Sequence, residues 1–234
     1  MKLTVIIPVF NEENTISELI EKVKLAKLPE YLSREIIVVD DGSGDRTAKK
    51  IKKISGVRFF AHKKNYGKGA AIKTAMSKAR GDIVLIQDAD LEYDPSDYKR
   101  LIAPILKKEA EVVYGSRFKN LKFALVGKNK TPLPFHFVGN KVLTALTNLL
   151  YGSKLTDMET CYKVFKKVIV SPEEIKADRF DFEPEFTAKV LKKGIKIVEV
   201  PITVSPRSYS EGKKITWRDG LDAFRVIIGL RLLP

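Results

Sequence analysis

The sequence is poor in the residues that build many common functional sites. Among its 234 residues there is one cysteine, Cys161, and there are two histidines, His62 and His136. A single cysteine excludes an intrachain disulfide framework and a cysteine-based zinc site. With only two histidines, a histidine-rich metal site and a Ser-His-Asp triad are also disfavoured.

Long apolar runs are absent as well. No stretch of 18 apolar residues occurs, so the sequence predicts no transmembrane helix. The amino terminus enters a strand-like run at Leu3 without the pattern of a signal peptide, and we therefore expect an intracellular protein. With 44% hydrophobic and 31% charged residues the chain can bury a sizeable core, and its length suits one domain over residues 1–234.

Acidic residues are missing from one long part of the chain. Lysine and arginine total 43 against 29 aspartate and glutamate, a net charge of +14. No acidic residue occurs from Val112 to Thr156, whereas five crowd between Asp88 and Asp97. A basic excess attracts nucleic acid, anionic lipid or phosphorylated small molecules. A surface rich in charge with a single glutamine is also typical of hyperthermophile proteins, which can explain part of the excess.

Apolar segments of two lengths alternate along the first half of the chain. Short apolar runs at 3–9, 35–40, 57–61, 82–87 and 111–115 read as buried strands, separated by helical patterns at 11–27, 45–54, 67–79 and from 95 to about 108. This alternation predicts an α/β fold with a Rossmann-like, mostly parallel sheet and helices on both faces. In the second half we expect strands at 161–165 and 196–204 and helices at 135–151, 183–193 and 217–233, the first and last of them amphipathic.

Asp88-Ala89-Asp90 follows one of the expected strands and is the sharpest local motif. Polar residues at strand ends lie where ligands bind in such sheets. Two carboxylates two residues apart repel each other without a cation, and oxygen ligands suit Mg²⁺ or Mn²⁺. Alternatively, Asp90 and Asp94 cap the turn before the helix at Pro95.

Two further motifs contain glycine. Asp40-Asp41-Gly42-Ser43 can accept hydrogen bonds from a ribose or a base, or can form an ordinary turn. Asn65-Tyr66-Gly67-Lys68-Gly69 opens a helix, where free N–H groups and glycines allow a phosphate to approach closely. It matches neither the P-loop spacing nor the G-x-G-x-x-G fingerprint.

Five motifs in order resemble the family 2 glycosyltransferases, inverting enzymes of the GT-A fold that use nucleotide-sugar donors. They are Pro8-Val9-Phe10-Asn11-Glu12, Val39-Asp40-Asp41-Gly42-Ser43, Asn65-Tyr66-Gly67-Lys68-Gly69, Asp88-Ala89-Asp90 and Gly115-Ser116-Arg117. The resemblance is close over residues 1–117. Within the family the chain looks most like the dolichol-phosphate mannose synthases and polyprenyl-phosphate glucosyltransferases, with which 156–165, 182–185, Arg207 and 211–215 agree.

The resemblance implies roles for individual residues. Those implied around the nucleoside and donor are Pro8, Phe10, Glu12, Asp40, Asp41, Lys68 and Ala89. Asp88 and Asp90 would hold Mg²⁺ or Mn²⁺ and the donor diphosphate, with Glu92 as a third ligand where many relatives have Gln. Arg117, Arg207 and Lys213 would neutralise phosphates. The implied catalytic residues are Asp90, Arg117, Asp157 and Glu185, where Asp157 acts as a base or only orients the sugar; Glu183 and Glu185 could equally cap a helix.

The implied activity is transfer of a hexose from GDP-mannose, or as second choice UDP-glucose, to dolichyl or polyprenyl phosphate. Residues 1–117 would bind the nucleotide sugar and residues 118–234 the acceptor. The helices at 135–151 and 217–233 either lie in an anionic membrane interface or pack on the sheet as core helices. The expected location is the cytoplasmic face of the cell membrane, as a peripheral protein.

Other interpretations stay open. The acceptor could instead be a soluble sugar or a protein. A nucleic-acid binder is disfavoured because no helix-turn-helix, zinc finger or aromatic RNA-binding motif occurs. Many relatives carry transmembrane helices after the catalytic domain, and this sequence ends at Pro234. We therefore expect either an anchorless type, which a separate membrane subunit could accompany, or a piece of a longer protein.

Overall fold

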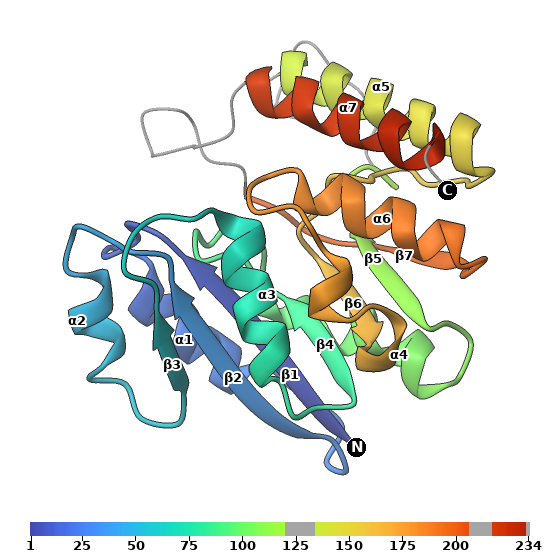
Figure 1. Ribbon diagram of the computed structural model, residues 1–234. Helices are drawn as coiled ribbons and strands as arrows, with labels where there is room; N and C mark the ends of the chain where they lie inside the picture. Colours follow the sequence, from blue (N-terminus) through green and yellow to red (C-terminus); the bar gives the residue numbers. More distant parts are fainter. Residues whose placement is uncertain (120–133, 206–216, 233–234) are drawn as a thin grey trace.

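The computed structural model describes residues 1–119, 134–205 and 217–232 and contains a seven-stranded sheet covered by helices on both faces (Figure 1). Four strands, β1 (Lys2–Val9), β2 (Ser33–Asp40), β3 (Arg58–Ala61) and β4 (Ile83–Ile86), are parallel and lie in the order β3-β2-β1-β4. The order continues with β6 (Lys163–Lys166), β5 (Val112–Ser116) and β7 (Ile197–Pro201). The predicted mostly parallel α/β sheet is confirmed.

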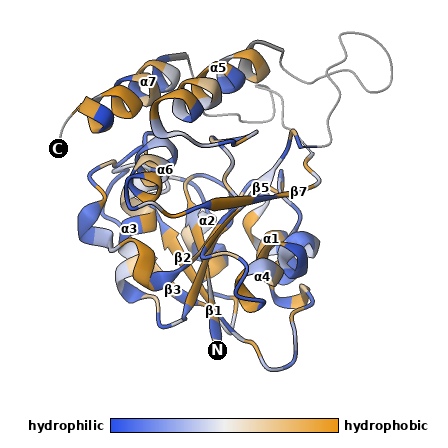
Figure 2. Cartoon of the chain, turned by 90° about the vertical axis from the view of Figure 1, so that its right-hand side faces the viewer, coloured by the Kyte–Doolittle hydropathy of each residue, from blue (hydrophilic) through white to orange (hydrophobic). Residues whose placement is uncertain are grey.

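Helices cover the two faces of the sheet in pairs (Figure 2). On one face lie α1 (Ile16–Leu25) and α4 (Tyr98–Leu106), with the short α2 (Thr47–Ile51) packed beside α1. On the other face lie α3 (Lys68–Lys78) and α6 (Phe182–Lys192). Helix α1 buries Ile16, Leu19, Ile20 and Val23, the i, i+3, i+4, i+7 pattern of an amphipathic helix. Three short 3-10 turns, Pro95–Asp97, Lys167–Ile169 and Pro172–Glu174, complete the connections.

Helices α5 (Pro134–Tyr151) and α7 (Trp217–Leu232) lie side by side and stack on α6, away from the sheet (Figure 1). The amphipathic helices predicted at 135–151 and 217–233 are therefore present, and they pack on another helix rather than on the sheet. Within the described ranges, no helix is long and apolar enough to cross a membrane. Arg207 and Lys213 lie outside the described residues.

Strand β6 runs antiparallel to both of its neighbours, β4 and β5. It therefore begins at the edge of the sheet where the parallel strands end. As a result, the segment that leads into β6, residues 157–162, lies beside the residues that follow β4 and β5. This reversed strand brings the second half of the sequence to the same edge as the first.

Candidate active site

The ends of β1 and β2 are joined by hydrogen bonds between their turns. Val9 lies opposite Asp40 in the parallel register. After β1, Asn11 has a φ of 49°, its N–H donates to Ser43 Oγ at 2.8 Å, and its side-chain oxygen accepts from Gly44 N at 2.9 Å. The Ser43 hydroxyl donates to Asp40 Oδ1. The strand-end residues predicted to surround a nucleoside are therefore adjacent in space, with Pro8 paired to Val39 and with Phe10 and Glu12 following β1.

Asp41, which follows β2, is held by the loop that precedes α3. Its carboxylate accepts from His62 Nδ1 at 2.7 Å, Tyr66 N at 3.0 Å and Gly67 N at 2.7 Å, and only 3% of the residue is exposed. His62 in turn contacts Thr74 Oγ1 through its other ring nitrogen, at 2.9 Å. Asp41 thus connects the end of β2 to the loop before α3. His62 supports Asp41 and was not identified from the sequence motifs.

The amino terminus of α3 is covered by the loop that precedes α6. Gly69 N donates to Arg179 O at 3.2 Å and Ala70 N to Asp178 O at 2.9 Å. A Cβ atom at Gly67 would lie 2.3 Å from Asp178 O, and one at Gly69 would lie 2.6 Å from Ala177 O. These glycines therefore allow a close approach of the protein's own backbone. Of the N–H groups that we expected to be open to a phosphate, those of Tyr66, Gly67 and Gly69 are therefore used within the protein.

Lys68, the first residue of α3, places its ammonium between two carboxylates. Its Nζ lies 2.9 Å from Asp88 Oδ1, 3.1 Å from Asp88 Oδ2 and 2.8 Å from Glu183 Oε1. Burial by itself lowers the pKa of Lys68, but the neighbouring acidic groups, Asp88 foremost, raise it well above the usual value. Lys68 is therefore a charged group at the end of β4.

The turn after β4 carries the two carboxylates predicted to bind a metal. Asp90 Oδ1 accepts from Glu92 N at 3.0 Å, and the intervening Leu91 has a φ of 64°, which is rare for a bulky residue and marks a constrained turn. No three acidic, histidine or cysteine side chains of the described residues converge to hold a metal. The Glu92 backbone N–H thus caps the Asp90 carboxylate, and the Glu92 side chain stays a predicted third ligand.

The pair formed by Asp88 and Asp90 nevertheless fits a divalent cation. An ammonium already lies against both oxygens of Asp88, which shows that this carboxylate accepts a cation. Mg²⁺ typically binds through one or two carboxylates and completes its shell with substrate phosphates and water. Ala89, between them, is buried and contributes no charged group.

Arg117, directly after β5, forms a bidentate ion pair with Asp157. Nε and Nη2 of Arg117 lie 2.7 Å from Asp157 Oδ2 and Oδ1, and the Arg117 backbone N–H donates to Oδ2 at 2.9 Å. Asp157 is fully buried, whereas 22% of the Arg117 side chain is exposed. Burial is the largest single effect and lowers the pKa of Arg117, but the Asp157 carboxylate, together with Tyr93 and Glu159, raises this pKa, so the net shift is well upward. The guanidinium is a permanent, fixed positive charge.

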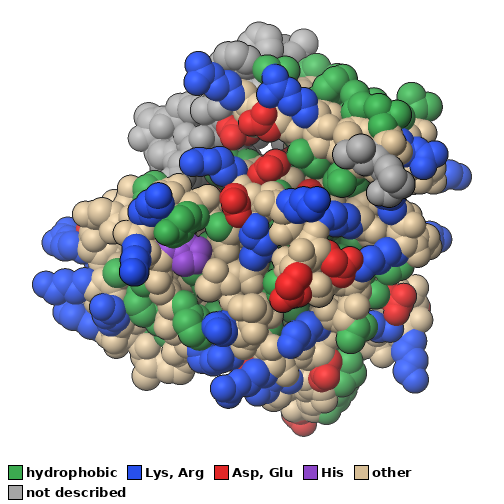
Figure 3. Space-filling view, viewed as in Figure 1, with side chains coloured by type: hydrophobic (Ala, Val, Ile, Leu, Met, Phe, Trp, Pro, Cys, Tyr) green, Lys and Arg blue, Asp and Glu red, His purple; other side chains and the backbone are tan. Residues whose placement is uncertain are grey.

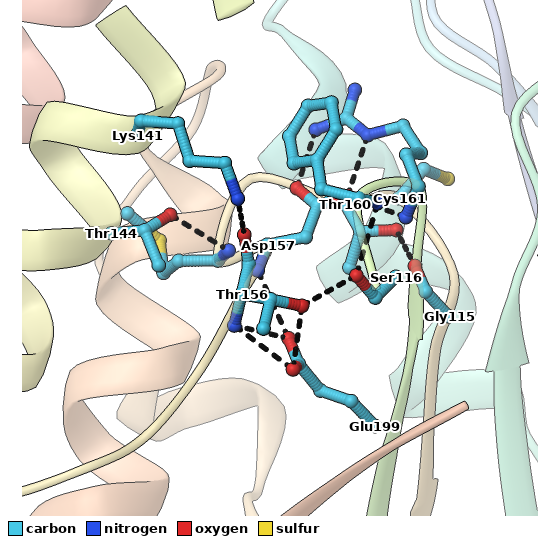
Figure 4. Close-up of polar contacts among 12 residues, drawn as sticks. Gly115, Ser116, Lys141, Thr144, Thr156, Asp157, Thr160, Cys161 and Glu199 are labelled. Carbon is cyan, nitrogen blue, oxygen red and sulfur yellow. Dashed lines mark hydrogen bonds and ion pairs between the residues drawn. The ribbon is translucent and has the colours of Figure 1, made fainter. Parts of the chain in front are cut away.

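The turn that carries Asp157 is clamped from two sides (Figure 4). From β7, the Glu199 carboxylate accepts from Thr156 N at 2.9 Å, from Thr156 Oγ1 at 2.8 Å and from Asp157 N at 3.0 Å. From α5, Lys141 Nζ donates to Thr156 O at 3.0 Å, and Thr144 Oγ1 accepts from Met158 N at 3.1 Å. Sequence analysis missed Glu199, although a charged residue within the apolar run of β7 was a usable signal.

Glu183 and Glu185 point to different places. Residues two apart on a helix do not share a face. Glu183 contacts Lys68, whereas Glu185 accepts from Lys176 N at 3.0 Å and pairs with Lys189 Nζ at 2.5 Å. The structure therefore brings Glu183 into the Asp88 centre and uses Glu185 to hold the loop before α6, contrary to our expectation that Glu185 faces the sugar or acceptor.

A half-buried acid, Glu159, and a buried lysine, Lys163, lie between these centres. Lys163 is fully buried and donates to Met158 O at 2.9 Å and to Thr160 O at 2.6 Å. Oε1 of Glu159 is buried and has no hydrogen-bond partner in the described part of the chain. Burial raises the pKa of Glu159 to about 8 and lowers that of Lys163 to about 8. Neither residue was singled out from the sequence.

Helices α5 and α7 expose apolar side chains (Figure 3). On α5, Val138, Val142 and Leu149 are 53%, 57% and 80% exposed, at a spacing that places them on one side of the helix. On α7, Leu221, Phe224 and Leu232 are 48%, 44% and 77% exposed. We call these six residues the apolar face of the α5–α7 pair.

The chain is similar to proteins of known family. A model described as Glycosyl transferase family 2 matches residues 4–171. The UDP-N-acetylglucosamine–dolichyl-phosphate N-acetylglucosaminyltransferase of Methanococcus voltae is 30% identical, over 97% of this chain and 95% of that protein. The dolichol-phosphate mannosyltransferase of Pyrococcus furiosus is 29% identical over 91% of this chain but only 59% of that protein. The chain likewise spans 65% and 48% of two other curated relatives.

Solved structures share the fold. The glucosyl-3-phosphoglycerate synthase of Mycobacterium tuberculosis, crystallised with Mn²⁺, UDP and glucosyl-3-phosphoglycerate, matches with a TM-score of 0.72 and 20% identity. The match covers 100% of this chain and 81% of that chain and confirms the GT-A architecture. Because the family model covers most of the chain, including the ends of β1, β2, β4 and β5, this protein is a member of Glycosyl transferase family 2.

Proposed function

We propose that this protein transfers a hexose from a nucleotide sugar to dolichyl or another polyprenyl phosphate, with GDP-mannose as the first and UDP-glucose as the second choice of donor. The observation that carries the proposal is the pair of cationic groups, Lys68 and Arg117, at one edge of the sheet. Both the donor diphosphate and the acceptor phosphate need positive charge. The names of the Methanococcus voltae and Pyrococcus furiosus relatives support a dolichyl-phosphate acceptor.

The donor would bind over the ends of β1, β2 and β4, within residues 1–117. Pro8, Phe10, Glu12, Asp40 and Asp41 would surround the nucleoside. Asp88 and Asp90 would hold Mg²⁺ or Mn²⁺, which when bound would neutralise charge on the diphosphate leaving group. The Mn²⁺ and UDP of the Mycobacterium tuberculosis structure support this use of a divalent cation.

The acceptor would bind within residues 118–234. A phosphate monoester with a second pKa of about 6 is largely ionised at neutral pH and needs little help from a base. Its oxygen would bond to the anomeric carbon from the side opposite the diphosphate while the bond to the diphosphate breaks, which inverts the configuration. Both oxygens of Asp157 accept from Arg117, so we assign Asp157 to positioning this cation rather than to removing a proton.

Three cationic residues are proposed to bind the phosphates. Arg117 would stabilise negative charge on the phosphates through a guanidinium whose position is already fixed. Arg207 and Lys213, which lie outside the described residues, are proposed to add to it.

The apolar face of the α5–α7 pair would dock on the membrane that holds the lipid acceptor. Its side chains are exposed on the outermost helices, and the acid-free span from Val112 to Thr156 includes α5. Apolar side chains combined with nearby lysines suit an anionic interface. We propose peripheral binding at the cytoplasmic face of the cell membrane, with room for a separate membrane subunit.

Sugar transfer into lipid tests the proposal. The purified chain is incubated with vesicles that contain polyprenyl phosphate, with Mg²⁺ or Mn²⁺ and with each radiolabelled donor in turn. We expect label in the organic extract with one donor. No label in either the organic or the aqueous product with any donor contradicts the proposal.

A second candidate keeps the donor site and replaces the lipid by a soluble acceptor. The similarity of fold to a synthase crystallised with glucosyl-3-phosphoglycerate favours it. Flotation with anionic vesicles distinguishes the two candidates. We expect the chain to float with the vesicles, and a Val142→Asp change, on the exposed apolar face, to reduce flotation several-fold, whereas no flotation of the unchanged chain favours the soluble acceptor.

A further inference from the structure

The ammonium of Lys68 occupies both oxygens of the Asp88 carboxylate. The distances are 2.9 and 3.1 Å, and the same nitrogen lies 2.8 Å from Glu183 Oε1. The Lys68 and Glu183 side chains are 14% and 5% exposed, whereas the Asp88 side chain is 23% exposed. Lys68 is therefore a shielded cation that bridges a buried carboxylate and a more accessible one.

The backbone around this bridge is fixed. Lys68 starts α3, whose first N–H groups donate to the carbonyl oxygens of Asp178 and Arg179. The loop containing those carbonyls leads directly into α6 and Glu183. Gly67 and Gly69 leave no room for a Cβ atom against this loop, so α3 and the start of α6 are held together. Because both backbones are fixed, the ammonium can change partners only by movement of the Lys68 side chain.

From this arrangement we propose that Lys68 is a resident cation of Asp88, which a divalent metal must displace, and that Glu183 retains the ammonium when it leaves. The inference rests on the proposed donor site. A metal bound to Asp88 would lie a few ångströms from the ammonium, where two positive charges repel strongly. Glu183 offers the displaced ammonium a partner that is already in contact.

One consequence concerns the order of binding. Without nucleotide, the metal must compete with Lys68 for Asp88, and it binds weakly. A donor diphosphate supplies new acceptor oxygens for the ammonium, and it also contributes ligands to the metal. Metal and nucleotide should therefore bind together much more strongly than either one binds alone, which prevents the centre from being filled by metal without donor.

The test is Mn²⁺ affinity of the full chain without nucleotide, measured by calorimetry or by electron paramagnetic resonance. Lys68→Met removes the competitor and should tighten Mn²⁺ binding about tenfold or more. Glu183→Gln leaves Lys68 with Asp88 alone and should weaken it. Lys73→Met is the matched control, since Lys73 lies on the same helix but pairs with Asp178 at 2.6 Å, and it should leave Mn²⁺ affinity unchanged.

A double variant separates competition from net charge. Lys68→Met with Glu183→Gln keeps the same net charge as the unchanged protein and leaves no buried carboxylate unpaired, so it guards against a failure of the single variant to fold. Competition predicts that this double variant binds Mn²⁺ more tightly than the unchanged chain. Equal or weaker binding overturns the inference and leaves the proposed transferase intact. If no variant binds Mn²⁺ even with GDP or UDP present, both the inference and the proposed metal site are wrong.

Discussion

The two cationic centres at the sheet edge are built in different ways. Lys68 holds two carboxylates as a compact charge on a flexible stem, and one of those carboxylates is partly accessible to solvent. Arg117 holds one fully buried carboxylate through a planar fork and its own backbone N–H. Lysine suits contacts that change, whereas a bidentate arginine pair fixes geometry. The difference supports the proposal of an exchangeable centre near the proposed donor motifs and a rigid centre beside the proposed acceptor half.

The surroundings of the two centres strengthen this contrast. The Asp157 turn is bonded to Glu199 on β7 and to Lys141 and Thr144 on α5 (Figure 4). Asp88, in contrast, pairs with the side-chain ammonium of Lys68, and 23% of its side chain is exposed. A rigid centre preserves the orientation of a phosphate-binding group, while an exchangeable one can admit a metal with its ligand.

The largest expected effect comes from removing Asp90, the proposed metal ligand beside the exchangeable centre. Asp90→Ala removes a proposed metal ligand and should lower turnover by about 1,000-fold or more, because charge stabilisation of the leaving group is lost. The fold should persist, since Asp90 lies in a turn at the edge of the sheet. Turnover is measured by sugar transfer, and folding by circular dichroism.

Asp94→Ala is the matched control for that change. Asp94 accepts from Ser96 N at 2.9 Å in the neighbouring turn and should affect stability without abolishing transfer. Near-normal turnover in the Asp90 variant would mean that the metal assignment is wrong.

Breaking the rigid centre should instead cost stability. Asp157→Asn leaves the Arg117 guanidinium without its buried carboxylate and should lower the free energy of unfolding by about 3 kcal/mol. Asp88→Asn should cost about 1 kcal/mol or less, because Lys68 keeps Glu183 as a partner. Urea denaturation of both variants compares them, and equal losses would remove the distinction between the centres.

Substitutions of Glu199 test whether its hydrogen bonds to the Asp157 turn keep Arg117 in position. Glu199→Ala leaves the N–H groups of residues 156 and 157 without acceptors and should cost about 2 kcal/mol of stability, together with a fall in transfer. Glu199→Gln keeps one acceptor oxygen and should restore most of the transfer. If both variants lose stability but keep full transfer, Glu199 supports the fold without positioning the site.

The smallest expected effect is on the pH dependence of stability and comes from Glu159, the acid between the two centres. The raised pKa of Glu159 means that the folded state binds its proton more tightly than the unfolded chain, so this contribution to stability is lost as pH rises from about 5 to 8. Glu159→Gln should remove this loss and therefore be more stable, relative to the unchanged chain, at pH 8 than at pH 5. Denaturant titrations at the two pH values measure the difference. A constant difference would contradict it.

Most strands and helices could be predicted because their patterns are local. The continuous apolar runs of β1, β2 and β4 and the spacing of apolar residues in α1 suffice. The predicted start of the first helix at residue 11 was early, since Asn11 has a positive φ and bonds to Ser43 in the turn after β1. A local sequence pattern cannot predict such a hydrogen bond between the turns that follow two different strands.

The site was predicted only in part, for a related reason. The motifs that follow parallel strands could be located because the end of such a strand fixes where the next residues lie. The reversal of β6, the pairing of Lys68 with Glu183, and the use of Gly67 and Gly69 by the loop before α6 all depend on contacts between distant segments. Glu183 and Glu185 belong to the same sequence motif. The side of α6 on which each residue lies determines that Glu183 contacts Lys68 and Glu185 contacts Lys189.

The most direct test of the account is calorimetric titration of GDP and UDP into the full chain with and without Mn²⁺. The account predicts that one of the two nucleotides binds, and that Mn²⁺ tightens its binding at least about tenfold, as metal and diphosphate displace Lys68 from Asp88 together. Binding of neither nucleotide, or binding that Mn²⁺ leaves unchanged, would contradict a metal-assisted nucleotide-sugar site at this edge of the sheet.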